Sequence, residues 1–296
     1  MARAVPDLAE STQRDVRRFL KNDILPRLGD LRIEEITGGE IVHMVEQIGK
    51  RSAVVARRAF TITSVIFSHG IAKHLAQSNP CASLKLKAIL GKQQPVLETV
   101  SLTEKQLRAV LPRLREVGRA NALAVKVLLA TCTRKGELIR ARWEHLDLEQ
   151  NLWNIRAELS KNRKPFTIPL PEVVVGWFRD LRELARGSEW VMPSQNHRGR
   201  MVDRTLNGAL YRLDDSLPRF TVHDLRRTAR SHLGALGVDV IVAEKCLNHT
   251  LGGLVDVYDR GNYLPQRRKA LELWASFLVC CEEGRPWNVE PLRAVA

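Results

Sequence analysis

A scattered set of six side chains has the chemistry needed to attack a phosphodiester without a bound metal. The set contains two guanidiniums, one ammonium, two imidazoles and one phenol. Guanidinium and ammonium groups bind phosphate oxygens, an imidazole transfers a proton near neutral pH, and a phenol can form a covalent bond to phosphorus. The residues are Arg134, Lys161, His223, Arg226, His249 and Tyr258.

Local spacing is compatible with both structural and chemical roles for the arginines. Arg134 and Glu137 lie three residues apart, the spacing of a surface ion pair on a helix. His223 and Arg226 have the same spacing, so on a helix they share a face and could reach one phosphate group. Arg227 is one position off that face, and we assign it to structure or to a phosphate contact.

The lysine and the tyrosine each have neighbouring alternatives. Lys161 belongs to a basic hairpin cluster with Arg163 and Lys164, in which a solvent-facing role is the default and Lys164 is the second choice for chemistry. Tyr258 is one of three tyrosines, with Tyr263 close by and Tyr211 remote. By themselves, Tyr258 could be a half-buried core aromatic and His249 a structural histidine at a helix end.

The sequence around these residues resembles the catalytic domain of tyrosine recombinases, the phage-integrase family. The matching segments, in family order, are TCTRKGEL, SKNRKPFTIPL, FTVHDLRRTARSHL and LNHTLGGLVDVYDRG. Tyr258 follows His249 by nine residues, the spacing at which the family has its nucleophile. The family usually has Gly-His where this chain has Asn248-His249, and asparagine is the next-best residue for a left-handed turn.

The resemblance implies a mechanism. Tyr258 would attack the scissile phosphate and form a 3′-phosphotyrosyl bond, while Arg134, Arg226 and His249 bind the non-bridging oxygens. A tyrosine has a pKa of about 10, so a base that assists its deprotonation is expected.

Within this mechanism, His223 is the expected base, and Lys161 would protonate the 5′-oxygen leaving group. The phosphotyrosine conserves the bond energy, so no cofactor and no metal are expected. A zinc site at His223, His232 and His249 is the competing interpretation, but the sequence has no HExxH or CxxC pattern to support it.

Composition favours a nucleic-acid partner. The chain has 296 residues, 47 Lys and Arg against 33 Asp and Glu, and a formal charge of +14. Such a field attracts polyanions, which favours a nucleic-acid partner. The resemblance to tyrosine recombinases implies that this partner is double-stranded DNA carrying a specific recombination site. Five cysteines without a CxxC pair, no signal-peptide pattern and no long apolar run favour the cytoplasm, in association with the nucleoid and not with a membrane.

Hydrophobic periodicity predicts a helical bundle over residues 1–90, resembling a core-type DNA-binding domain. One helix is expected to end at Pro26, Thr37 to cap the next, and a third to cover 53–76. Residues 79–100 lack strong periodicity and are interpreted as a linker, and the boundary between the two domains is placed within it at 91–100. Many relatives have a further arm-binding domain before the bundle; this sequence is interpreted as a short recombinase or part of a longer one.

Residues 101–284 are predicted to form the catalytic domain, and 285–296 a C-terminal tail. A capping box at Thr103 and Gln106 begins it. Alternating segments between 143 and 171 predict a short antiparallel sheet with Lys161 on its hairpin. Helices are expected over 171–186, 203–213, 223–236, 239–247 and 265–281. The fold class is therefore mainly α with a small antiparallel β-sheet.

The last predicted helix suggests how protomers assemble. Its apolar stripe includes Leu273, Trp274 and Phe277, which most often means core packing. In the resembled family this helix docks on a neighbour, which implies a homotetramer on DNA through the C-terminal helix. The expected activity is integration or excision of a mobile element; the alternatives are a type IB topoisomerase-like enzyme and a non-catalytic DNA-binding regulator.

Overall fold

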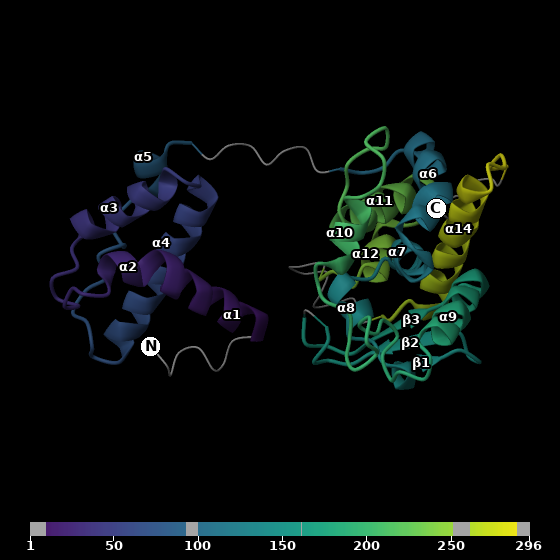
Figure 1. The fold of residues 1–296 in the computed structure, drawn as a ribbon, viewed down its shortest axis with the longest axis horizontal. Helices are drawn as coiled ribbons and strands as arrows, with labels where there is room; N and C mark the ends of the chain where they lie inside the picture. The colour runs from purple at the N-terminus through teal and green to yellow at the C-terminus, as the bar shows by residue number, and fades with distance from the viewer. Residues whose placement is uncertain (1–9, 93–99, 161, 251–260, 289–296) are drawn as a thin grey trace. The chain divides into compact units, whose positions relative to one another are not determined.

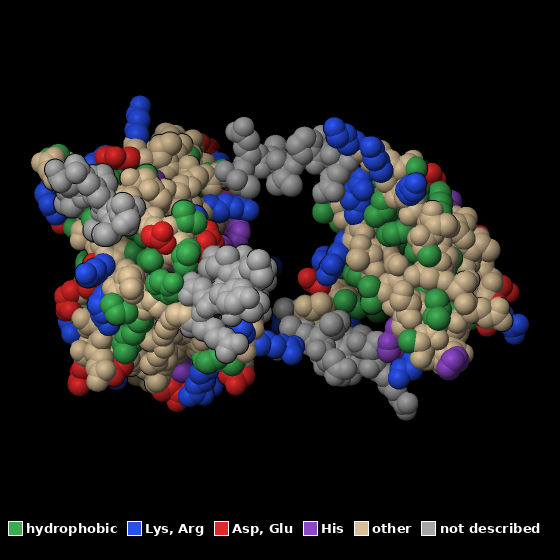
Figure 2. Space-filling model, turned by 180° about the vertical axis from the view of Figure 1, so that it is seen from behind, with side chains coloured by type: hydrophobic (Ala, Val, Ile, Leu, Met, Phe, Trp, Pro, Cys, Tyr) green, Lys and Arg blue, Asp and Glu red, His purple; other side chains and the backbone are tan. Residues whose placement is uncertain are grey.

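The computed structural model describes residues 10–92, 100–160, 162–250 and 261–288. The chain divides into two compact units, Met1–Leu97 and Glu98–Ala296 (Figure 1). None of the helices in the described parts is long and apolar enough to cross a membrane. On the face that Figure 2 shows, Lys and Arg side chains lie on both units.

The N-terminal unit is a helical bundle, as its periodicity predicts. Its elements are α1 (Glu10–Phe19), η1 (Leu20–Ile24, a π-helical turn), α2 (Leu25–Leu28), α3 (Gly38–Gly49), α4 (Ala53–Ala72) and α5 (Leu86–Leu90). Helices α3 and α4 form the centre, with Ile41 and Met44 fully buried against Ala56 and Ala59. Thr37 caps α3 as predicted, because its side chain accepts a hydrogen bond from the backbone N of Gly39 at 3.2 Å.

Two expectations for this unit are wrong. Pro26 does not end a helix but lies in the first turn of α2. Backbone N–H groups in the first turn of a helix make no hydrogen bond within it, so a proline, which lacks this N–H, is tolerated there. The segment after residue 79 is not all linker, because Cys81 is buried and Leu86, Ile89 and Leu90 pack against the bundle core. Short apolar stretches of this kind have no clear period, and only contact with the bundle orders them.

The C-terminal unit is a larger helical domain with a small sheet. It begins with α6 (Glu104–Val110), η2 (Leu111–Val117, a 3-10 helix), α7 (Arg119–Thr131), α8 (Lys135–Ile139) and η3 (Trp143–His145, a 3-10 turn). The sheet and the later helices are β1 (Leu146–Asp147), β2 (Leu152–Ile155), β3 (Phe166–Pro169), α9 (Glu172–Leu184), α10 (Thr205–Leu210), α11 (Val222–Ala235), α12 (Val240–Cys246) and α14 (Leu264–Glu282). The predicted fold class, mainly helical with a small antiparallel sheet, is confirmed.

The sheet has the order β1-β2-β3 with antiparallel pairing, and Trp153 lies opposite Ile168. Helix α9 lies beside it, and its Phe178 packs edge-on against Trp153 at 5.7 Å between ring centroids (Figure 1). Helix α7 is the centre of this unit; its side chains from Leu123 to Thr131 are buried almost without interruption against α9, α11 and α14. The residues that directly follow α7 form part of the candidate site.

Helix α14 is part of this same core. Leu271 and Trp274 are fully buried, and the Trp274 indole donates to the carbonyl of Leu129 at 2.9 Å. Phe277 stacks on Trp274 with 5.7 Å between ring centroids. The apolar stripe that the sequence offers for docking on a neighbour therefore packs within its own domain.

Candidate active site

Arg134 lies in the short connection between α7 and α8. Cys132 ends α7 in the left-handed conformation with φ 57°, and this turns the chain so that Arg134 becomes the N-cap residue of α8. Glu137, only 4% exposed, accepts the backbone N–H of Arg134 at 2.6 Å through Oε2 and its Nη1 at 3.1 Å through Oε1. Glu137 thus fixes both ends of the arginine, and the pair is not a loose surface contact.

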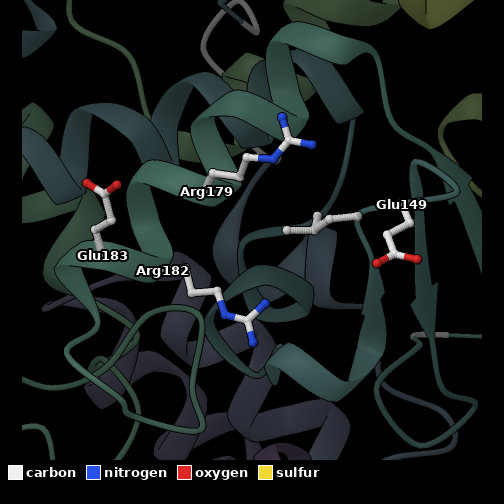
Figure 3. A pocket seen from close by; sticks show the side chains of 5 residues that line it. Glu149, Arg179, Arg182 and Glu183 are labelled. Atoms are coloured by element: carbon white, nitrogen blue, oxygen red, sulfur yellow. The ribbon is translucent and has the colours of Figure 1, made fainter.

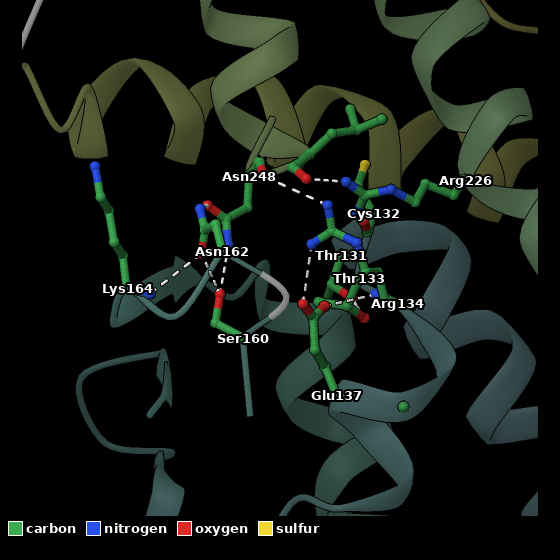
Figure 4. Close-up of polar contacts among 12 residues, drawn as sticks. Thr131, Cys132, Thr133, Arg134, Glu137, Ser160, Asn162, Lys164, Arg226 and Asn248 are labelled. Atoms are coloured by element: carbon green, nitrogen blue, oxygen red, sulfur yellow. Dashed lines mark hydrogen bonds and ion pairs between the residues drawn. The ribbon is translucent and has the colours of Figure 1, made fainter. Parts of the chain in front are cut away.

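Arg226 comes from α11 and is 5% exposed. Its Nη1 donates to the carbonyl of Cys132 and its Nη2 to the carbonyl of Leu247, so it connects the ends of α7 and α12 (Figure 4). Within the described residues, it forms no ion pair with a carboxylate. Burial, followed by the charge of Arg134, lowers the pKa of Arg226 to about 10.

Such a buried guanidinium without an anionic partner is electrostatically costly. An arginine has five N–H donors, and two carbonyl contacts do not exhaust them. The position of Arg226 therefore favours the arrival of an anion.

His249 follows a left-handed residue after α12. Asn248 has φ 49°, as the sequence predicts for this turn, and its carbonyl accepts from Arg134 Nη2 at 3.4 Å. The His249 ring is 40% exposed, and its Nδ1 lies 2.6 Å from Oε2 of Glu244. Glu244 also accepts from Nε of Arg230 at 2.6 Å, which holds the carboxylate in place.

The pKa of His249 is lowered, first by burial and then by the charges of Arg226 and Arg134, against the raising effect of Glu244. A neutral His249 ring therefore donates Nδ1–H to the Glu244 carboxylate, which leaves Nε2 without a proton.

His223 and Arg226 line a small cavity of about 250 Å³ together with Arg134. The remaining lining residues are Thr133, Lys135, Gly136, Asn207 and Val222. His223 is accessible to solvent, but its partial burial, followed by the charge of Arg227, lowers its pKa, so the ring is neutral and able to accept a proton at neutral pH. The predicted face shared by His223 and Arg226 therefore opens on one polar cavity.

Two of the six predicted residues, Lys161 and Tyr258, lie outside the described residues. Lys161 stands in the sequence between Ser160 and Asn162, and the structure describes both of these. Of the other tyrosines, Tyr211 is 74% exposed beneath Arg219, and Tyr263 is partly buried against the core at the start of α14.

The remaining alternatives have structural explanations. Arg227 forms an ion pair with Asp224 at 2.7 Å, which is the structural role considered for it. His232 Nε2–H donates a hydrogen bond to the Leu102 carbonyl at 2.8 Å, and the ring stacks on Trp274, so His232 belongs to the core. The described residues contain no cluster of three His, Cys, Asp or Glu side chains placed to hold a metal ion.

A second hollow, of about 520 Å³, lies between α9 and the turn after β1. Arg179 and Arg182 line it together with Glu149 and Glu183 (Figure 3). Its two positive and two negative charges balance, and the guanidinium of Arg182 lies 5.7 Å from the ring centre of Trp143. This surface lacks the excess positive charge of the cavity at Arg134.

Sequence reasoning missed the residues that hold the predicted ones. Glu244 and Asn207 carried no motif, and the two carbonyls that accept from Arg226 cannot be recognised by residue type. The position of Glu244, five residues before His249 and in the last turn of α12, is the one signal that could have found it.

A helical bundle joined to a mainly helical domain, in which Arg134, Arg226 and His223 line one polar cavity, is the arrangement of the tyrosine-recombinase class. The family model described as Phage integrase family matches residues 101–264, and the one described as Phage integrase central domain matches residues 1–87. The chain belongs to the phage integrase family.

Individual relatives agree with this. Prophage integrase IntA of Escherichia coli K12 is 27% identical over 91% of this chain and 66% of its own length. The integrase of Enterobacteria phage P4 is 24% identical over 91% of this chain and 65% of its own length. The chain thus spans slightly less than two thirds of the length of these relatives.

Among solved structures, a lambda integrase dimer bound to a core site has a TM-score of 0.65 at 19% identity, covering 82% of this chain and 89% of that one. The Tn1549 transposon integrase in complex with a circular intermediate DNA also has a TM-score of 0.65, at 17% identity, covering 90% and 95%. At these sequence identities, the similarity to the solved structures shows a shared fold and nothing beyond it.

Proposed function

We propose that this protein is a site-specific DNA recombinase that cleaves and rejoins DNA through a 3′-phosphotyrosine, for the integration or excision of a mobile element. The observation that carries the proposal is the buried Arg226 beside Arg134 on one cavity, with no carboxylate paired to Arg226 in the described residues. A phosphodiester is an anion that would supply the missing charge. The names of the relatives, prophage and phage integrases, support the same activity.

In the proposed reaction, the Tyr258 oxygen forms a bond to phosphorus as the bond from phosphorus to the 5′-oxygen breaks. Arg134, Arg226 and His249 hold the non-bridging oxygens, where negative charge increases in the transition state. His223 takes the proton of the tyrosine, and Lys161 gives a proton to the departing 5′-oxygen. A 5′-hydroxyl of the partner strand then attacks the phosphotyrosine and releases Tyr258.

The N-terminal unit would bind the DNA duplex through α4. This helix of twenty residues contains Arg57, Arg58 and His69 and not one acidic residue. Arg58, Thr61 and Val65 are exposed along one side of it. A positively charged helix face with few competing anions suits a phosphate backbone or a DNA groove. Replacing Arg58 with alanine should weaken binding and reduce its dependence on salt.

We further propose that protomers assemble as a homotetramer on two duplexes, acting on the nucleoid in the cytoplasm. A lambda integrase tetramer bound to a Holliday junction, with a TM-score of 0.66 at 18% identity over 86% of this chain and 76% of that one, supports the fold needed for such an assembly. The burial of Leu271 and Trp274 argues against the apolar stripe of α14 as the protomer contact. We therefore propose the tetramer with that contact left unassigned.

Trapping of a covalent protein–DNA adduct tests the proposed chemistry. A randomised duplex pool is incubated with the protein, adducts are isolated under denaturing conditions, and the captured DNA is sequenced. Tyr258→Phe should abolish adducts and leave DNA affinity almost unchanged, since it removes one hydroxyl and no charge. Tyr263→Phe is the matched control and should still form adducts; the reverse result would reassign the nucleophile.

The captured duplex also separates the alternative functions. Recombination between two copies of it indicates a recombinase, whereas relaxation of supercoiled DNA by single protomers without exchange indicates a type IB topoisomerase-like enzyme. DNA binding without any adduct from the wild-type protein would indicate a non-catalytic regulator and would contradict the proposal.

A further inference from the structure

Asn248 links the hairpin between β2 and β3 to the arginine site. Its Nδ2 donates to Oγ of Ser160 at 3.2 Å, and its Oδ1 accepts from Nδ2 of Asn162 at 3.0 Å (Figure 4). Asn162 Oδ1 in turn accepts from Oγ of Ser160 and from the backbone N of Lys164 at 3.3 Å. One side-chain amide from the turn after α12 thus holds the hairpin residues on both sides of position 161.

The backbone of Asn248 contacts the arginine side of the site. Its carbonyl accepts from Arg134, and the next residue is His249. The left-handed φ of 49° is the conformation that glycine adopts most easily. An asparagine here has a modest conformational cost, and its side chain supplies the two hydrogen bonds to the hairpin.

The network is specific in its geometry. Ser160 is buried, and Asn162 and Asn248 are half-buried, so their polar groups are largely removed from water. Loss of one partner would leave a poorly solvated amide or hydroxyl unsatisfied. Because the three side chains exchange both donors and acceptors, the hairpin has one favoured position relative to Arg134.

We propose that Asn248 is a positioning residue that sets the hairpin carrying Lys161 at the correct distance from the phosphate held by Arg134 and Arg226. This inference rests on the proposed function, because it assigns to Asn248 the placement of the general acid. Asn248 itself transfers no proton and binds no DNA in this role. We expect Asn248 to affect the cleavage rate only by positioning Lys161.

Asn248→Gly tests the proposal, because glycine keeps the left-handed backbone and removes the amide. The matched control is Asn151→Gly in the turn between β1 and β2. Asn151 also has a positive φ, of 56°, and its Nδ2 donates to Glu172 at 3.1 Å. Both variants thus lose a side-chain hydrogen bond at a glycine-compatible position, and thermal unfolding should show both proteins folded.

The substrate is the duplex captured by the wild-type protein, synthesised with either oxygen or sulfur as the 5′-bridging atom at the cleaved phosphate. A thiolate leaves without a proton, so the sulfur substrate does not need Lys161. Asn248→Gly should slow adduct formation on the oxygen substrate by about 10- to 100-fold, the effect of a misplacement near 1 Å, and on the sulfur substrate by less than about threefold. Asn151→Gly should behave as the wild type on both.

A second variant provides an independent readout. Lys161→Ala is combined with Asn248→Gly, and the double variant should be no slower on the oxygen substrate than Lys161→Ala alone, because both changes remove the same function. Ser160→Ala removes one partner from the hairpin side and should show the same preference for the sulfur substrate. It replaces Asn248→Gly should that variant fail to fold.

The possible failures are distinguishable. Equal slowing on both substrates, or additive losses in the double variant, would show that Asn248 acts on phosphate binding or on the domain as a whole, and would overturn the inference. No slowing at all would also overturn it. Failure of the wild-type protein to form adducts on either substrate would instead contradict the proposed function, on which the inference rests.

Discussion

Glu137 contacts Arg134 at two points, through the backbone N–H at 2.6 Å and through Nη1 at 3.1 Å. The carboxylate is buried, so it restricts the guanidinium to one position at the cavity. A neutral amide could accept only one of these bonds from its oxygen and would place N–H groups toward another donor. The position of Arg134 thus depends on the charge of Glu137 as well as on its shape.

Glu137→Gln is therefore expected to slow adduct formation by about tenfold or more through misplacement of Arg134. It should also lower the free energy of unfolding by roughly 1–3 kcal/mol, the range for a buried hydrogen bond to a charged group. Chemical denaturation and single-turnover cleavage measure the two effects. The control is Glu189→Gln, whose exposed ion pair with Arg142 should contribute less than about 1 kcal/mol. Comparable effects in both variants would contradict the role of Glu137.

The contacts of Arg226 with two carbonyls require a planar guanidinium, whose two terminal nitrogens each donate to one carbonyl. Lysine keeps the charge but has one nitrogen and a different geometry, so Arg226→Lys should leave a buried carbonyl of Cys132 or Leu247 unsatisfied. We expect a loss of about 1–3 kcal/mol in the free energy of unfolding and about 100-fold in cleavage. Arg113→Lys, at a surface ion pair with Glu116, is the matched control. Normal cleavage by Arg226→Lys would exclude bidentate binding by this residue.

The pH dependence should reflect His249 and Glu244. In the free protein the pKa of His249 is below its ordinary 6.5, and Nε2 can donate to a phosphate oxygen only after the ring gains a proton. Cleavage should therefore fall as the pH rises through the pKa of His249 in the DNA complex. Glu244 raises this pKa, against the lowering charges of Arg226 and Arg134.

Glu244→Gln removes that carboxylate, so the alkaline limb of the cleavage profile should move to lower pH by about one unit. The acidic limb is assigned to His223, which must be neutral to accept a proton and whose pKa is also lowered. This limb should stay in place. Single-turnover rates across the pH range give both limbs. An unmoved alkaline limb would show that the proton belongs to another group.

The burial of α14 predicts how the domain responds to truncation. Removal of residues from 264 onward deletes Trp274 and Leu271 from the core, so the catalytic domain should unfold and lose DNA cleavage. Trp274→Ala alone should cost about 3–5 kcal/mol. Deletion of 289–296 is the control and should retain the unfolding midpoint. Circular dichroism and denaturant titration check this; a folded protein without α14 would show that the helix is dispensable to its own domain.

The sequence by itself determined the class of protein and the chemistry. Four motifs in order indicated the family, and the resemblance to that family implied the roles proposed for Arg134, Arg226 and the two histidines, with which their residue types are consistent. Local signals were equally informative: the caps at Thr37 and Thr103, and the left-handed turn at Asn248, depend on interactions within a few residues.

Tertiary structure decided what contacts each of these groups. Glu244, the carbonyls that accept from Arg226, and the amide network from Asn248 to Ser160 involve residues up to 94 positions apart in sequence. An apolar stripe is the same whether a helix packs on its own domain or on a neighbour, so the burial of Trp274 could not be read from periodicity. Side-chain type specifies which chemistry is available, and the packed chain specifies its position and its pKa.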